Sequence, residues 1–277
     1  MIKFLKYRFF AFIFSILFVF NPLYSIGENI KEPIKFQLSN LADENSINQV
    51  RDILLKHLSQ DVVDEFFKSV NDYNSTIKNT SLVSKFQSKI PNYDLSSISE
   101  LWHSRKDHFI GFNCRITTFQ LLKNSIEIDE GKIDDDLLFM DKDAISSGKI
   151  FTSDELTKFK RLFSRVKTEA TKDINIHAKK MQEHFSQFKF NSNIKMVSVV
   201  INDNLDGNYL FIGHVGVLIE DDGKFLFIEK LSFEEPYQAI IFNSENDCYN
   251  LLLDRYKDYS DSDTARPFIM VNNEFIK

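Results

Sequence analysis

The sequence places a cysteine where its thiol would be reactive. Cys114 follows Gly111 by three positions, and an apolar run begins two positions after it, at Ile116. Gly111 permits a sharp turn, and the apolar run predicts a buried helix with Cys114 in its first turn. The unpaired amide groups and the positive dipole at that end of a helix favour a thiolate. We therefore interpret Cys114 as a candidate nucleophile.

Three polar residues are candidates for assisting this nucleophile. Backbone amides at the start of the helix would stabilise an oxyanion, and Arg115 would add positive charge there. Asn113 and Gln238 are further candidates, because an amide side chain can orient a histidine or polarise a carbonyl group.

A histidine flanked by glycines is the candidate base. His214 lies between Gly213 and Gly216 at the start of an apolar run. Glycines leave room for another group to approach a strand closely, so packing alone explains this pattern poorly. An imidazole at this position can take a proton from a thiol and return it to a leaving amine. The alternative is a core histidine whose ring is bonded to a backbone carbonyl.

An acid interrupts the next apolar run. Glu229 lies within residues 225–231, and a half-buried carboxylate needs a partner. Asp222-Gly223 predicts a hairpin with a two-residue turn, in which positions whose numbers sum to 445 lie opposite each other. Gly216 then faces Glu229, and His214 lies diagonally across on the same face. A turn longer by one residue would put Glu229 on the other face.

The two cysteines leave alternatives open. In a secreted protein, Cys114 and Cys248 either form one disulfide or leave a thiol free for chemistry. Cys248 lies in a helical pattern and is interpreted as a core residue. If Cys114 is bridged or is an inert buried thiol, Glu229 is better interpreted as part of a surface ion pair with Lys230 or Arg115.

The first 27 residues predict a cleaved secretory signal peptide. Three basic residues precede an uncharged apolar run at 9–20, and small residues follow it. That run is too short to span a bilayer. Removing residues 1–27 takes away three of the 34 basic residues and none of the 40 acidic ones, which leaves a net charge of −9. This balance argues against a nucleic-acid partner, and nothing after residue 27 is apolar enough to span a membrane.

The hydrophobic pattern predicts helices first and an antiparallel sheet second. We expect helices near 45–70, 95–103, 113–123, 172–188 and 245–256, a polar turn at 71–79, a capping box at Thr152–Glu155, and strands at 196–201, 209–219, 225–231 and 239–242. This order predicts an α+β fold. Residues 28–277 are expected to form one domain, with a helical insertion around 125–190.

An acidic run at 127–136 has two interpretations. Six of its ten residues are acids, which is compatible with a metal loop or with a solvated surface loop. The spacing does not fit an EF-hand, so we favour the surface loop. We predict no metal site and no cofactor.

Part of the sequence resembles a known enzyme signature. Residues 213–219, the Asp222-Gly223 turn and residues 227–229 are similar to the signature of the NlpC-type cell-wall cysteine peptidases and amidases. In that papain-like superfamily a cysteine opens a buried helix, a histidine starts a strand, and a polar residue lies on the next strand.

The resemblance implies a role for each residue of the candidate site. Cys114 would be the nucleophile, His214 the base and Glu229 the residue that orients the base. Asn113 and Arg115 replace the usual neighbours of the cysteine, and 100 residues separate the cysteine from the histidine, which implies a large insertion.

A second resemblance covers nearly the whole chain after the signal peptide. The chain is similar to the secreted bacterial proteins grouped as domain of unknown function 4300, at residues 71–76, 112–117, 138–141, 213–217, 235–238 and 264–270. Many members look like lipoproteins, whereas this chain lacks the lipobox cysteine. The resemblance implies a bacterial envelope location and brings no assigned activity.

Two functions follow as hypotheses. The first is a secreted or periplasmic cysteine hydrolase that cleaves amide or ester bonds in peptide or peptidoglycan-like substrates. The second is a secreted binding protein that keeps a papain-like scaffold without turnover. The sequence indicates no oligomeric state.

Overall fold

The computed structural model describes residues 34–191 and 193–277. Ile34–Lys277 form one compact unit. The predicted signal peptide, residues 1–27, lies outside the described residues.

Helices make up most of the first two thirds of the described chain, and one further helix lies in the last third. They are α2 (Glu44–Leu55), α3 (Gln60–Thr76), α4 (Leu95–Lys106), α5 (Cys114–Leu122), α6 (Phe139–Gly148), α7 (Ser153–Leu162), α8 (Ile174–Phe185) and α9 (Glu245–Tyr256), with a 3-10 turn, η1 (Asp136–Leu138). Most begin at a side chain that accepts a hydrogen bond from a first-turn N–H group, which satisfies a donor that the helix itself leaves unpaired. These N-cap residues are Asp43, Asp94, Asn113, Thr152, Asp173 and Ser244.

Strands form one large sheet and one small one. They are β1 (Phe36–Ser39), β2 (Ile126–Ile128), β3 (Val166–Lys167), β4 (Phe188–Phe190), β5 (Lys195–Asp203), β6 (Tyr209–Asp221), β7 (Lys224–Lys230), β8 (Tyr237–Phe242), β9 (Phe268–Val271) and β10 (Glu274–Phe275). In the described residues the large sheet has the order β1-β8-β7-β6-β5-β9-β10, with β3 beside β6, while β2 pairs with β4. The strand pairs are antiparallel.

The large sheet is covered on both faces. Val215, Val217 and Ile219 of β6 belong to a core shared with α2, α3 and α5–α8. Leu218 belongs to a second core that is shared with α9. Since alternate residues of a strand point to opposite faces, α9 lies on one face and the other helices lie on the opposite one. Helices packed on an antiparallel sheet confirm the α+β prediction.

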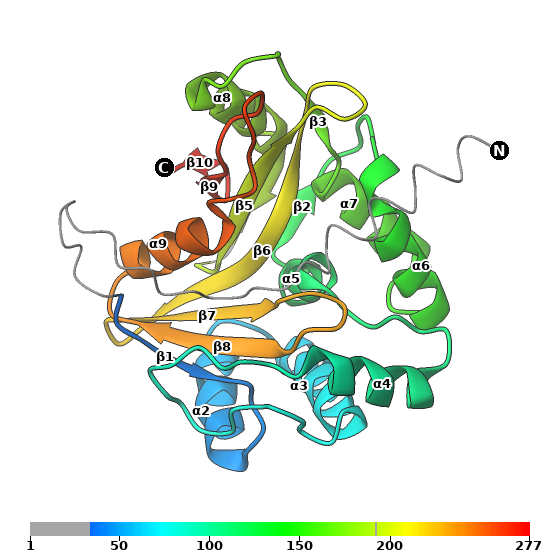
Figure 1. The fold of residues 1–277 in the computed structure, drawn as a ribbon, viewed down its shortest axis with the longest axis vertical. Coiled ribbons are helices and arrows are strands. Elements are labelled where there is room, and N and C mark those ends of the chain that lie inside the picture. The colour runs from blue at the N-terminus through cyan, green and yellow to red at the C-terminus, as the bar shows by residue number, and fades with distance from the viewer. Residues whose placement is uncertain (1–33, 192) are drawn as a thin grey trace. The chain divides into compact units, whose positions relative to one another are not determined.

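The central strands separate where α5 packs. The pairs between β6 and β7 run from Asp221↔Lys224 to Val217↔Ile228. On the N-terminal side of Val217, β6 no longer pairs with β7. There β6 turns away from β7 and β8, and α5 lies beside this divergence (Figure 1). α5 contacts both β6 and β7.

Two local predictions were wrong or incomplete. Residues 71–76 are the end of α3 and not a turn, because Tyr73 and Asn74 are buried there. The edge strand β1 was not predicted, since its four residues pair with β8, some 200 positions away in the sequence. The capping box is confirmed: Thr152 and Glu155 bond to each other's backbone N–H groups.

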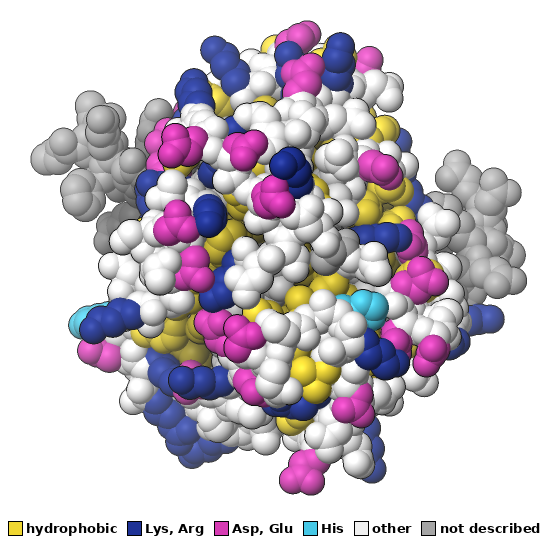
Figure 2. Space-filling view, turned by 180° about the vertical axis from the view of Figure 1, so that it is seen from behind, with side chains coloured by type: hydrophobic (Ala, Val, Ile, Leu, Met, Phe, Trp, Pro, Cys, Tyr) yellow, Lys and Arg dark blue, Asp and Glu magenta, His cyan; other side chains and the backbone are white. Residues whose placement is uncertain are grey.

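The surface that faces away from the viewer in Figure 1 carries a mixed charge pattern. Figure 2 shows acidic and basic side chains interspersed there, with apolar side chains exposed between them. Among the described residues, no helix combines the length and apolar character needed to cross a membrane.

Candidate functional site

Cys114 is the first residue of α5, as predicted. Asn113 caps the helix, and its Oδ1 accepts a hydrogen bond of 2.9 Å from the Ile116 N–H. Gly111 has φ +99°, and a Cβ there would lie 3.1 Å from the Trp102 ring. The turn before the helix therefore favours glycine for both its backbone angle and its packing. Cys114 itself is 6% exposed.

The hairpin has the predicted register. Asp221 pairs with Lys224, so the turn contains only Asp222 and Gly223. His214 alternates regularly with Gly216 and Leu218 on one face of β6, and a β-bulge at Gly213 interrupts the pairing with β5 just before it. His214 and Glu229 are both buried, and the His214 Nε2 lies 2.5 Å from the Glu229 Oε2.

The Cys114 thiol lies close enough to the same imidazole for the two groups to shift each other's pKa. Since Glu229 occupies Nε2, Nδ1 is the ring nitrogen left for the sulfur. Burial alone would raise the pKa of the Cys114 thiol, but His214, and then Arg115, lower it below its ordinary value. Burial would lower the pKa of His214, whereas Cys114 and Glu229 raise it to about 9. Both directions favour a thiolate–imidazolium pair.

The last turn of α9 supplies two residues that the sequence analysis did not identify. Arg255 Nη1 donates to Glu229 Oε1 at 2.9 Å and to Oε2 at 2.8 Å. Burial would raise the pKa of Glu229, but Arg255 and His214 lower it to about 2. The Tyr256 ring stacks on the His214 ring, with centroids 5.2 Å apart. Because α9 and α5 lie on opposite faces of the sheet, the imidazole is held from both sides where the strands separate.

Asn113 and Arg115, the candidates on either side of Cys114, both bond to Asp141. Arg115 Nε and Nη2 donate to the two oxygens of the buried Asp141, at 3.0 and 2.7 Å. Asn113 Nδ2 donates to the same carboxylate at 2.7 Å. Arg115 also donates to the Ile212 carbonyl at 3.1 Å, which ties the start of α5 to β6. In this structure both side chains are therefore engaged in holding the first turn of α5.

Gln238 lies opposite Glu229 on β8. Its Nε2 donates to the Tyr93 hydroxyl at 2.8 Å, and Asn40 donates to the same oxygen at 2.7 Å. The Gln238 Oε1 is buried without a hydrogen-bond partner. Gln238 thus extends the polar layer around Glu229 and does not contact His214 through any of these bonds.

Lys230 is a buried ammonium close to the site. Its Nζ donates to the carbonyls of Ser232, at 2.7 Å, Phe233 and Glu235, and it lies 4.1 Å from the centre of the Tyr73 ring. Burial lowers the pKa of Lys230 to about 7. Glu229 therefore pairs with Arg255, and not with Lys230 or Arg115.

Both cysteines are free thiols in the structure. Cys248 belongs to α9 and is fully buried in the core between this helix and the sheet. Burial raises the pKa of its thiol well above the ordinary value, opposite to the direction found for Cys114.

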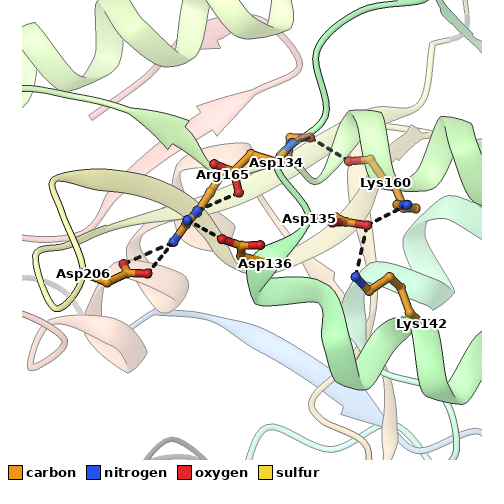
Figure 3. A network of polar contacts seen from close by, with 8 residues as sticks. Asp134, Asp135, Asp136, Lys142, Lys160, Arg165 and Asp206 are labelled. Atoms are coloured by element: carbon orange, nitrogen blue, oxygen red, sulfur yellow. Dashed lines mark hydrogen bonds and ion pairs between the residues drawn. The ribbon is translucent and has the colours of Figure 1, made fainter. Parts of the chain in front are cut away.

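The acidic run at 127–136 is largely neutralised by nearby basic side chains. Arg165 is held between Asp134, Asp136 and Asp206, and Asp135 lies between Lys142 and Lys160 (Figure 3). Within residues 34–191 and 193–277, no group of three or more His, Cys, Asp or Glu side chains is arranged to hold a metal ion.

Two surface cavities, each of about 600 Å³, lie away from this site. One is lined by residues around the start of α8 and the C-terminus, and the other by residues near the hairpin turn at Asp222. Cys114, His214 and Glu229 line neither of them.

Comparison with family models identifies the family. The model described as domain of unknown function (DUF4300) matches residues 37–276. The chain belongs to this family. Neither the curated proteins nor the solved structures that were searched gave a match.

The geometry of this DUF4300 chain allows one kind of chemistry in particular. A thiol, an imidazole and a carboxylate lie in series, the imidazole is hydrogen-bonded to the carboxylate, and the cysteine lies at the positive end of a helix. Such a series can generate a thiolate, and the protonated ring can then give a proton to a leaving group.

Proposed function

We propose that this protein is a cysteine-dependent hydrolase that cleaves amide or ester bonds through Cys114, His214 and Glu229. The single observation that supports the proposal most strongly is the buried His214 imidazole, whose Nε2 lies 2.5 Å from the Glu229 carboxylate while the ring also interacts with the Cys114 thiol. A histidine held only for packing would not need a carboxylate on one nitrogen and a thiol beside the ring.

The reaction would proceed through an acyl-enzyme. The Cys114 thiolate attacks the substrate carbonyl carbon and forms a C–S bond, and amide groups of the first turn of α5 face the developing oxyanion. The His214 imidazolium gives its proton to the leaving amine or alcohol as the C–N or C–O bond breaks. His214 then takes a proton from water, whose oxygen attacks the thioester carbon; the C–S bond breaks, the acid is released, and the thiolate–imidazolium pair is restored.

The resemblance to the NlpC-type enzymes supports a substrate class. The cysteine at the start of a buried helix and the histidine on a strand agree with that papain-like plan. With the predicted signal peptide, this favours peptide or peptidoglycan-like substrates outside the cytoplasm, in the periplasm or the extracellular space. A papain-like core and an NlpC-type activity are thus part of the proposal.

Catalysis requires the site to open. Cys114 is 6% exposed and His214 is 1% exposed, so an acyl group reaches the sulfur only if covering residues move. The segment 231–236 lies close to the turn before α5, because a Cβ at Gly111 would be 3.3 Å from the Phe233 carbonyl oxygen. We propose that this segment moves when substrate binds.

Covalent trapping tests the proposal. The purified protein is incubated with an electrophilic acyl probe, and the adduct is located by mass spectrometry of its peptides. We expect one adduct, on Cys114, which Cys114→Ser and His214→Ala abolish and the matched control Cys248→Ser retains. Absence of an adduct on a folded wild-type protein would contradict the hydrolase and favour the binding protein, in agreement with the closed site.

A further inference from the structure

Four ionisable groups, three of them buried, follow one another in alternating order of charge. The Cys114 thiol interacts with His214, His214 is bonded to Glu229, and Glu229 is bonded to Arg255. The side chains of His214 and Glu229 are 1% and 0% exposed, and that of Arg255 is 15% exposed. When the thiol is ionised and the ring is protonated, the series contains two anions and two cations.

Burial makes this balance important. An isolated charge costs several kcal/mol to bury, and a buried ion persists when an opposite charge is bonded to it. His214 alone would have to compensate both the thiolate and the carboxylate. The Arg255 guanidinium contacts both Glu229 oxygens, so it compensates the carboxylate without needing the imidazole.

We propose that Arg255 is a positioning residue that acts through Glu229: as its counter-ion, Arg255 allows the Cys114 thiolate and the Glu229 carboxylate to exist together in the buried site. This inference rests on the proposed function, because it concerns how the same nucleophile is generated.

The other ionisable groups around the site do not replace Arg255. Those that interact electrostatically with members of the series are Tyr93, Tyr256, Cys248, Glu235, Lys230, Arg115 and Asp141. Of the two cations among them, Arg115 is bonded to Asp141 and Lys230 to backbone carbonyls. Arg255 is thus the cation that the described structure places on Glu229 besides His214.

Removing the guanidinium should therefore add a proton to the site. Arg255→Met leaves two anions and one cation. Glu229 keeps the imidazolium as its bonded partner, so the thiolate is the anion that takes up a proton at neutral pH. The nucleophile is then lost.

The test follows the thiolate itself, by its ultraviolet absorbance across a pH series and by the rate of Cys114 alkylation. We expect Arg255→Met to shift the appearance of the thiolate upward by at least about one pH unit, which is about a tenfold loss of thiolate below the midpoint. Arg255→Lys should recover part of the loss. The control Lys257→Met removes a cation from the turn after α9, where Lys257 pairs with Asp254, and should leave the profile unchanged.

A double variant separates charge balance from simple loss of structure. Glu229→Gln with Arg255→Met removes one anion and one cation, so the thiolate profile should return toward that of the wild type. The same comparison decides the question if the single variant does not fold. An unshifted profile in Arg255→Met, or a double variant that forms no thiolate at the wild-type pH, overturns the inference.

The inference and the proposed function fail in different ways. If the acyl probe gives no adduct but Arg255→Met shifts the thiolate profile, Arg255 has the role inferred here and the hydrolase is wrong. If the adduct forms and the profile does not move, the hydrolase stands and the role of Arg255 is wrong.

Discussion

His214 lies between a sulfur and a carboxylate, and this position determines its charge. Burial opposes protonation of the ring, but Cys114 and Glu229 raise its pKa to about 9. The imidazole is therefore a proton donor at neutral pH, and it is paired with a thiol whose pKa is lowered. The proposed acyl transfer needs this protonated ring to release the leaving group.

Because His214 holds the proton, the pH profile of substrate hydrolysis should differ from the pH profile of Cys114 alkylation. Hydrolysis should fall as pH rises through about 9, because the imidazolium that protonates the leaving group is lost. Alkylation of Cys114 by iodoacetamide should not fall there, because alkylation needs only the thiolate. Rates of substrate hydrolysis and of alkylation over the same pH series check this; a parallel fall in both would contradict it.

Lys230 is a second residue whose surroundings give a prediction. Lys230→Met removes the side-chain hydrogen-bond donor of three backbone carbonyls. A buried carbonyl oxygen that loses its donor lowers the stability of the fold. We expect the free energy of unfolding in urea to fall by about 1–3 kcal/mol. Lys224→Met, on the same strand but exposed, should change it by less than about 0.5 kcal/mol. Equal effects of the two substitutions would contradict the role given to the buried ammonium.

The residues of the site differ in how far the sequence could reveal them. Cys114, His214 and Glu229 stand out because each is a chemically active residue in an apolar or glycine-rich setting. Arg255 and Tyr256 lie in an ordinary amphipathic helix, and nothing in their spacing marks them. Their contact with the hairpin is set by the packing of α9 on the sheet, which no local pattern encodes.

α5 is the element that carries the proposed nucleophile. Its first turn is fixed by the Asn113 cap and by the bonds of Asn113 and Arg115 to Asp141. Cys114 therefore lies near His214 at a helix end whose N–H groups are oriented in advance. The sequence predicted this helix and its start, because the glycine turn and the apolar run agree.

The cap of α5 should affect both stability and reactivity. Asn113→Ala removes the acceptor of the Ile116 N–H and should lower the free energy of unfolding by about 1 kcal/mol. Thr152→Ala removes the cap of α7, far from Cys114 in sequence, and should cost a similar amount. Only Asn113→Ala should slow Cys114 alkylation. If both substitutions slow it equally, the cap has no particular role at the site.

The register of the hairpin of β6 and β7 could be predicted from the sequence, but the pairing of the strands around this hairpin could not. A two-residue turn leaves one way to pair the flanking residues, so the approach of Glu229 to His214 followed from counting. The pairing of β1 with β8 depends on a strand some 200 positions away, and the bulge at Gly213 lies on the other edge of β6, where β6 pairs with β5. The two-residue turn determines neither of them.

Across the whole described unit, the site joins the two cores. Cys114 comes from the face covered by the many helices, and Arg255 and Tyr256 come from the face covered by α9. The α+β class and the order of most elements could be predicted from the hydrophobic pattern. The convergence of α5, α9 and the hairpin on one imidazole could not, because it depends on tertiary packing.

Because the site joins the cores, its charges should contribute to the stability of the whole unit. The pKa of Glu229 is lowered to about 2, below its ordinary value of 4.5, so its contribution is present above about pH 4.5 and is lost as pH falls through about 2. Glu229→Gln should therefore be most destabilising near neutral pH, and the difference from wild type should shrink in acid. Urea unfolding across that range checks this.

The control for this stability measurement is Glu220→Gln, an exposed carboxylate on the same hairpin. The difference between this variant and the wild type should be small near neutral pH. If Glu229→Gln destabilises the protein no more than Glu220→Gln at neutral pH, the buried carboxylate does not stabilise the unit as described.

The rate of Cys114 alkylation by iodoacetamide at about pH 6, in wild type and in His214→Ala, tests the central claim most directly. An ordinary thiol with a pKa of about 8.5 is almost wholly protonated at that pH and reacts slowly. The structure predicts that wild-type Cys114 reacts readily, that Cys248 stays unmodified, and that His214→Ala slows Cys114 by at least about tenfold. Equal rates in the two proteins would show that the imidazole does not activate the sulfur.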